Sequence, residues 1–271
     1  MRFILLGSGA VRPDLERYGP AQLLQINNKN LLFDCGRGAS MRLVQADIPL
    51  QEIDTVFFTH HHYDHNCDFP YLFITSWVLG RNVPMQVIGP RGTEKFCENL
   101  FHRAYKDDIA SRRGHPIYSA EGEKWIARDV TEKELILEYS DFTIKMIHHK
   151  HKSPLLDNIA YRIEAQGKSI VIVGDTIICE NLKDFAQGAD LMAHECSFPE
   201  KILIKEKWGK FHTNPKELGQ WARERGVKQL VLKHFCLRPG VVELNDLVNE
   251  VKETYGNEGL IVGHDLLEIE L

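Results

Sequence analysis

Four side chains that can bind metal ions stand within six residues of one another: His60, His62, Asp64 and His65. The apolar run at residues 55–58 comes directly before them and is typical of a buried strand. Side chains two residues apart in an extended backbone point the same way, so His60 and His62 can reach one ion. Asp64 and His65 follow where the chain must turn. They can bind a second ion beside the first.

A two-ion site needs more ligands than this stretch provides, and the ends of later strands can supply them. The candidates are His151 or His149, Asp175, and His234. Asp175 follows Gly174, which allows a close approach of the backbone, and its carboxylate is expected to bridge both ions. His61 is expected to point away from the metal. Asp34, at the end of another strand, is expected to orient a metal-bound histidine or else to cap the turn at residues 35–38.

Imidazole and carboxylate ligands favour zinc, with manganese, iron or cobalt as substitutes. None of the six cysteines forms a Cys-x-x-Cys pair, which argues against a thiolate site. Two divalent ions about 3.5–4 Å apart can hold a shared hydroxide and stabilise an in-line displacement. The sequence therefore predicts a dinuclear metal-dependent hydrolase that uses a metal-bound hydroxide.

The elements that must position these residues alternate between strands and helices. Helices are expected at residues 39–46, 93–105, 214–226 and 243–255, with short apolar strands between them. This alternation predicts an α/β sandwich whose polar strand ends share one active-site edge. Residues 106–135 are polar and are expected to form an irregular surface excursion. We expect a single domain over residues 1–271.

Composition excludes several classes of protein. The chain has 271 residues, of which 43% are hydrophobic and 26% charged, and a net charge of -5. That charge provides no overall basic field for nucleic acid, so RNA would have to bind a local patch. No apolar run approaches the roughly 20 residues of a membrane helix, and no export signal is recognisable. We therefore expect a cytoplasmic protein with reduced thiols and no membrane partner.

The spacing His60-x-His62-x-Asp64-His65 resembles the signature of the metallo-β-lactamase-fold hydrolases. Three shorter elements support the resemblance: Leu6-Gly7-Ser8-Gly9, Phe33-Asp34-Cys35-Gly36 and Gly174-Asp175-Thr176. It implies a four-layer αββα sandwich of two mixed β-sheets flanked by helices. It also implies one ion held by His60, His62 and a histidine near 150, for which His151 matches best and His149 is the alternative. The other ion would be held by Asp64, His65 and His234, with Asp175 bridging.

Within that family the chain resembles ribonuclease Z most. The elements that carry this resemblance are His194-Glu195-Cys196-Ser197, His212-Thr213 and the segment 232–238. It implies that Glu195, His212 and Arg238 act near the scissile phosphate, that Asp64 orients or deprotonates the nucleophile, and that the protein is a homodimer. His212 also precedes a predicted helix start, where the helix dipole favours an anion. A glutamate beside it would raise its pKa, so that it could donate a proton.

The substrate is less defined than the fold, because the glycine- and proline-rich arm that grips tRNA in ribonuclease Z is not recognisable here. The leading prediction is a phosphodiesterase or ribonuclease Z-like endoribonuclease acting on RNA or a small-molecule ester. Residues 75–81 and 89–93 also resemble arylsulfatase-like and phosphodiesterase-like relatives. An arylsulfatase-like or lactonase-like ester hydrolase on the same site is therefore an alternative. A non-catalytic metal-binding or RNA-binding scaffold is another.

Overall fold

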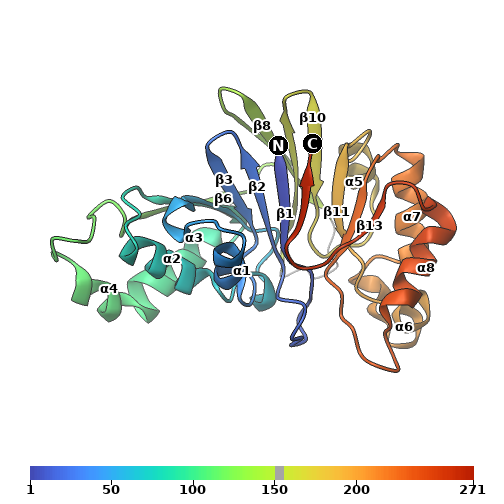
Figure 1. Cartoon of the computed structure of the whole chain (residues 1–271), viewed down its shortest axis with the longest axis horizontal. Helices are drawn as coiled ribbons and strands as arrows, with labels where there is room; N and C mark the ends of the chain where they lie inside the picture. Colours follow the sequence, from blue (N-terminus) through green and yellow to red (C-terminus); the bar gives the residue numbers. More distant parts are fainter. Residues whose placement is uncertain (150–155) are drawn as a thin grey trace.

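Two β-sheets face each other at the centre of the molecule, and helices cover their outer faces (Figure 1). The computed structural model describes residues 1–149 and 156–271. Helices α1 to α4 lie against one sheet and α5 to α8 against the other. The predicted four-layer αββα sandwich is therefore confirmed.

Each sheet has seven strands. The first, in spatial order, contains β14 (Leu267–Glu270), β1 (Arg2–Gly7), β2 (Ala21–Ile26), β3 (Lys29–Phe33), β4 (Thr55–Phe57), β5 (Met85–Pro90) and β6 (Trp125–Val130). The second contains β13 (Leu260–Val262), β12 (Leu230–Lys233), β11 (Leu191–Glu195), β10 (Lys168–Ile172), β9 (Asn158–Ala165), β8 (Phe142–His149) and β7 (Glu134–Glu138). Strands β3 to β6 are parallel to one another, as are β10 to β13. The remaining pairs are antiparallel.

The helices that cover the first sheet are α1 (Ala39–Gln45), α2 (Phe69–Val78), α3 (Thr93–Asn99) and α4 (Lys106–Arg112). Those that cover the second are α5 (Glu180–Phe185), α6 (Glu200–Lys205), α7 (Pro215–Glu224) and α8 (Leu244–Tyr255). Single turns η1 (Leu50–Glu52), η2 (Tyr63–His65) and η4 (Trp208–Lys210) are 3-10 helical, and η3 (Leu100–Ala104) is π-helical.

A continuous apolar core fills the space between the sheets. Phe33 and Phe57 stack with ring centroids 4.9 Å apart, and both contact Tyr161 of the facing sheet edge-on. Separate apolar clusters lie between each sheet and its helices. The central strands are consequently buried on both faces, which explains their nearly unbroken apolar sequences.

The parallel strands carry polar residues just past their carboxyl ends. Asp34 follows β3, His60 follows β4 and Asp175 follows β10, while Glu195 ends β11 and His234 follows β12. Because parallel strands end at the same edge of a sheet, and the two sheets face each other, these residues gather at one rim of the sandwich.

Two local predictions need correction. The stretch 106–135 is not irregular throughout, because it contains α4 and strand β6; residues 113–124 lie between them. Strand β6 was missed because its side chains alternate between half-buried and exposed at the edge of the sheet, so its sequence is polar. The helix predicted at 214–226 begins as expected, with Asn214 accepting bonds from the Lys216 and Glu217 amides at 2.9 and 3.4 Å, but it ends at Glu224.

Within residues 1–149 and 156–271, no helix combines the length and the apolar content needed to cross a bilayer.

Candidate active site

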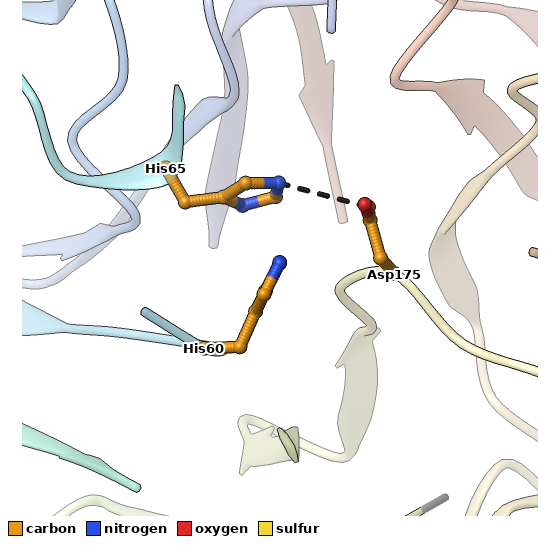
Figure 2. Close-up of side chains that lie close together, drawn as sticks. All are labelled: His60, His65 and Asp175. Atoms are coloured by element: carbon orange, nitrogen blue, oxygen red, sulfur yellow. Dashed lines mark ion pairs between the residues drawn. The ribbon is translucent and has the colours of Figure 1, made fainter. Parts of the chain in front are cut away.

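The residues predicted from the opening motif converge with side chains from both sheets. Two groups of possible ligands share His65: His60, His65 and Asp175 form one, and Asp64, His65 and His234 the other. Within each group the ligand atoms lie within 4.8 Å of one another. Figure 2 shows His60 and His65 reaching from the β4 side toward Asp175, which extends from the loop after β10.

The ligand atoms approach one another closely. His65 Nε2 lies 3.1 Å from His234 Nε2, 3.6 Å from Asp175 Oδ1 and 3.8 Å from Asp64 Oδ2. His60 Nε2 lies 2.9 Å from His62 Nδ1. Asp175 Oδ1 is buried and makes no hydrogen bond to any described residue. A buried carboxylate oxygen facing imidazole nitrogens suits a cation in their midst, so these residues fit a divalent metal.

Neighbouring groups orient the two central histidines. Asp34 Oδ2 accepts a bond from His65 Nδ1 at 2.9 Å, and its Oδ1 accepts one from the Thr59 amide at 2.8 Å. Ser197 Oγ lies 2.9 Å from His234 Nδ1. Both bonds leave Nε2 facing the cluster, as in histidines that bind metal. Asp34 thus contacts a histidine and also ties down its own loop, so both roles considered for it are compatible.

The charge of the cluster is unbalanced toward carboxylates. Burial opposes charging of His65, but Asp34, Asp64 and Asp175 outweigh it and raise the pKa of His65 to about 9. Burial acts against the charge of Asp64 as well, yet His65 and His234 hold the pKa of Asp64 below its ordinary value. Three buried carboxylates around these imidazoles attract positive charge, which a proton or a metal cation can supply.

The backbone at the site is close-packed. A Cβ on Gly174 would lie 2.5 Å from Thr59 Oγ1, and a Cβ on Gly36 would lie 2.3 Å from the Asp64 carbonyl oxygen. These glycines let the strand ends of the two sheets and the η2 turn approach one another. Asp34 and His234 adopt left-handed backbone conformations, with φ of 58° and 61°. Such conformations cluster at functional sites, where surrounding contacts stabilise them.

The other histidines divide clearly. His61 faces away from the cluster: its Nε2 lies 2.8 Å from Thr93 Oγ1, and its ring packs against Phe96. His149 ends β8 next to the cluster, with Nδ1 2.8 Å from Thr176 Oγ1. His151, the other candidate for the third histidine of the first ion, lies outside the described residues. The choice between His149 and His151 therefore stays a prediction.

A second group adjoins the cluster on the side of the second sheet. His212 Nδ1 donates to Glu195 Oε2 at 2.9 Å and lies 4.0 Å from Asp175 Oδ2. Burial opposes charging of His212, but the Glu195 carboxylate outweighs it and raises the pKa of His212 to about 9. Glu195 is fully buried and also accepts bonds from the Thr176 amide at 2.9 Å and from the Ser197 hydroxyl. It therefore holds His212 directly and His234 through Ser197.

Both groups open into one cavity of about 380 Å³. Its walls include the ligand candidates His62, Asp64, Asp175 and His234 together with His212 and Arg238. Arg238 Nη2 donates to Glu206 Oε1 at 2.9 Å, so its side chain is fixed at the wall. The cavity thus brings every catalytic residue predicted from the sequence, except the fully buried Glu195, to one surface.

Several residues of the site were missed from the sequence. Ser197 links Glu195 to His234, while Tyr63, Trp208 and Glu206 line the cavity. Tyr63 stands inside the opening motif, and its position between two ligand candidates was a usable signal. The other three lie in stretches with no spacing pattern, so only the packing of the second sheet reveals them.

Known proteins similar to this chain agree with the geometry. Residues 29–235 match the family model described as "Beta-lactamase superfamily domain". A ribonuclease Z from Mycobacterium sp. (strain KMS) is 30% identical over 245 residues, covering 87% of this chain and 85% of that relative.

Solved structures show the same fold. The metallo-beta-lactamase fold protein YhfI from Bacillus subtilis aligns with a TM-score of 0.78 at 20% identity, over 99% of this chain and 98% of that one. Human tRNase Z, short form, aligns with a TM-score of 0.74 at 22% identity, over 100% and 99% of the two chains.

Proposed function

The chain belongs to the ribonuclease Z family of the β-lactamase superfamily and is a metal-dependent hydrolase; from that premise we propose that it cleaves phosphodiester bonds, with an RNA phosphodiester as the leading substrate. The observation that carries the proposal is the Glu195–His212 pair, which adjoins the ligand cluster with His212 only 4.0 Å from Asp175. An imidazole held by a buried carboxylate beside a cation site can serve an anionic reacting centre.

We propose two divalent ions, zinc first, with manganese, iron or cobalt as substitutes. Their ligands would be His60, His62 and His151 or His149 for one ion, and Asp64, His65 and His234 for the other, with Asp175 between them. When bound, the ions supply Lewis acidity, which makes water more nucleophilic and stabilises negative charge on phosphate oxygens. The support is the convergence of Nε2 and carboxylate oxygens within 4.8 Å in each of the two groups described above.

The chain's own residues would handle the proton and the anion. Water adds to phosphorus, the bond from phosphorus to the leaving oxygen breaks, and the products are a phosphate monoester and an alcohol. His212 would donate the proton that the leaving oxygen takes, and Asp64 would orient the attacking water. Glu195 acts through His212 and is a positioning residue. Arg238, at the cavity wall, would bind a non-bridging phosphate oxygen.

Hydrolysis of bis(4-nitrophenyl) phosphate and of a precursor tRNA by the zinc- or manganese-loaded protein tests this function. We expect both to be cleaved, and we expect strong chelation to abolish cleavage. Activity that survives chelation would contradict the metal assignment. Hydrolysis of 4-nitrophenyl sulfate or of a lactone, without any phosphodiester cleavage, would reassign the site to another class of ester.

A homodimer and a cytoplasmic location are also part of the proposal. Apolar side chains of Met41 and Val44 on α1 and of Tyr71 on α2 are exposed, which supports contact with a second copy. Light scattering of the purified protein would distinguish a dimer from a monomer.

A further inference from the structure

An aromatic side chain that the proposed mechanism does not use lines the cavity beside the proton donor. Trp208, in η4 between α6 and α7, is 40% exposed and lies at the cavity wall with His212 and Arg238. Trp77 and Trp221, by contrast, are buried in the core. An exposed tryptophan at the wall of a cavity offers a large, flat surface to whatever enters.

The orientation of this indole is fixed rather than free. Trp208 Nε1 donates to Glu206 Oε2 at 2.9 Å, while the other oxygen of the same carboxylate accepts from Arg238 Nη2. The indole is also parallel to the ring of Phe198, at 10° and 6.1 Å between centroids. One carboxylate therefore sets the positions of an aromatic plane and of a guanidinium group together.

The distance from Trp208 to the proposed chemistry suits one arm of a phosphodiester. The indole centroid lies 6.3 Å from that of His212, whose ring donates to the leaving oxygen in the proposed function. A planar ring attached near that oxygen would reach the indole, because aromatic rings stack or meet edge-on at centroid distances of about 4.5–7 Å.

The rest of the cavity fits the same ligand. Arg12 and Arg238 give it positive charge for a phosphate, and Ala10, Val11 and Phe198 give it apolar surface for a ring. The Nε of Arg238 is buried without an acceptor among residues 1–149 and 156–271, so it is an available donor. The volume of about 380 Å³ stands near the lower end of the ~300–1,000 Å³ of small-molecule sites, which is room for one nucleotide-sized unit.

We propose that Trp208 is a stacking platform for a planar heterocyclic ring carried by the leaving arm of the phosphodiester, with Glu206 as its positioning residue. This subsite rests on the proposed function. It selects substrates by one ring next to the scissile phosphate, whether that ring is a base of RNA or belongs to a small diester. Stacking of one base on an aromatic side chain contributes ~1–3 kcal/mol, or about 5–150-fold in affinity.

The test compares two ligands that differ only in the ring, adenosine 5′-monophosphate and ribose 5-phosphate, on the zinc-loaded protein. Tryptophan fluorescence and calorimetry report the binding. We expect the adenosine ligand to bind at least about fivefold more tightly and to quench the fluorescence. In Trp208→Leu the quench and the preference should disappear, while ribose 5-phosphate binds as before. Trp208→Phe should keep most of the preference.

Trp125→Phe is the matched control, because Trp125 on β6 lines a different cavity with Phe101 and His102. It should change neither ligand's affinity. Glu206→Ala should reduce the preference less than Trp208→Leu does. An unchanged preference in Glu206→Ala would contradict its positioning role. Equal affinity for the adenosine ligand in wild type and Trp208→Leu, or equal loss of both ligands, would overturn the platform.

Cleavage of bis(4-nitrophenyl) phosphate by the same protein separates this inference from the proposed function. Cleavage without a Trp208-dependent preference overturns the platform alone. A Trp208-dependent preference without cleavage overturns the proposed function alone. Displacement of adenosine 5′-monophosphate by a structured RNA assigns the ring to RNA, and displacement by a dinucleotide alone assigns it to a small diester.

Discussion

The two halves of the candidate site are built in different ways. The first sheet supplies four potential ligands from one short stretch, His60 to His65, where β4 leads into η2. The second sheet supplies its residues from three separate places: the end of β11, the approach to α7 and the end of β12. The first half is local in sequence. The second exists only when strands far apart in the chain are paired, so its geometry depends on the packing of the whole second sheet.

This contrast assigns binding of metal to the local half and handling of protons and phosphate to the assembled half. Substitutions in each half should therefore have separable effects.

Replacing a ligand in the local half should have the largest effect. His62→Ala removes an imidazole 2.9 Å from His60 Nε2, so we expect loss of metal. Activity on bis(4-nitrophenyl) phosphate should fall by more than the ~10–100-fold that loss of a ligand-orienting group costs. Elemental analysis and initial rates check this. The matched control is His61→Gln in the same stretch, which should keep its metal; equal losses in both variants would contradict the contrast.

Replacing the proton donor in the assembled half should reduce the rate without removing metal. We expect His212→Ala to lower kcat by about 10²–10⁴-fold on a dinucleotide, whose alkoxide leaving group needs a proton. The loss should be smaller with a 4-nitrophenolate leaving group, which leaves without one. Rates on both substrates and metal content per chain measure this. Metal loss comparable to that of His62→Ala would show that the halves are not separable.

The groups that orient the two central histidines allow a direct comparison between the halves. Asp34 holds His65 and Ser197 holds His234, each at 2.9 Å. Asp34→Asn and Ser197→Ala should each weaken metal binding by about 10–100-fold. Competition with a chelator gives the affinities, and circular dichroism monitors folding. An effect in only one variant would show that one ion depends on its own half alone.

The pH dependence should report the Glu195–His212 pair with the smallest change at neutral pH. The pKa of His212 is raised to about 9, so the imidazole keeps its proton below that pH and loses it above. Activity on a dinucleotide should accordingly fall as pH rises through about 9. Glu195→Gln removes the charge that raises the pKa, so the fall should begin at lower pH, nearer 6.5. An alkaline limb unmoved in Glu195→Gln would exclude His212 as its source.

The same contrast explains how far the sequence could predict the site. His60 to His65 were readable because their spacing is local, and Asp34, Asp175 and His234 because each follows an apolar strand. Glu195, His212 and Arg238 were found only through a family resemblance, since no spacing rule connects them. Ser197, Glu206 and Trp208 were missed because their contacts form between loops of the second sheet.

The fold was predictable for a similar reason. Strands buried on both faces are apolar and easily recognised, as β1, β4 and β10 show. Strand β6 and helix α4 were missed because they lie at an edge and face solvent, where burial no longer determines the residue types.

The pairing of β14 with β1 has a consequence for any attempt to divide the molecule. The first sheet is completed only by residues 267–270, which come after every strand of the second sheet. A fragment of residues 1–133 would expose the backbone hydrogen-bonding groups of β1, next to the buried side chains of Phe3 and Leu5. Exposed edges of this kind recruit other chains. Such a fragment should aggregate unless the complementary piece donates β14, so the two halves are interlocked like the parts of a clasp.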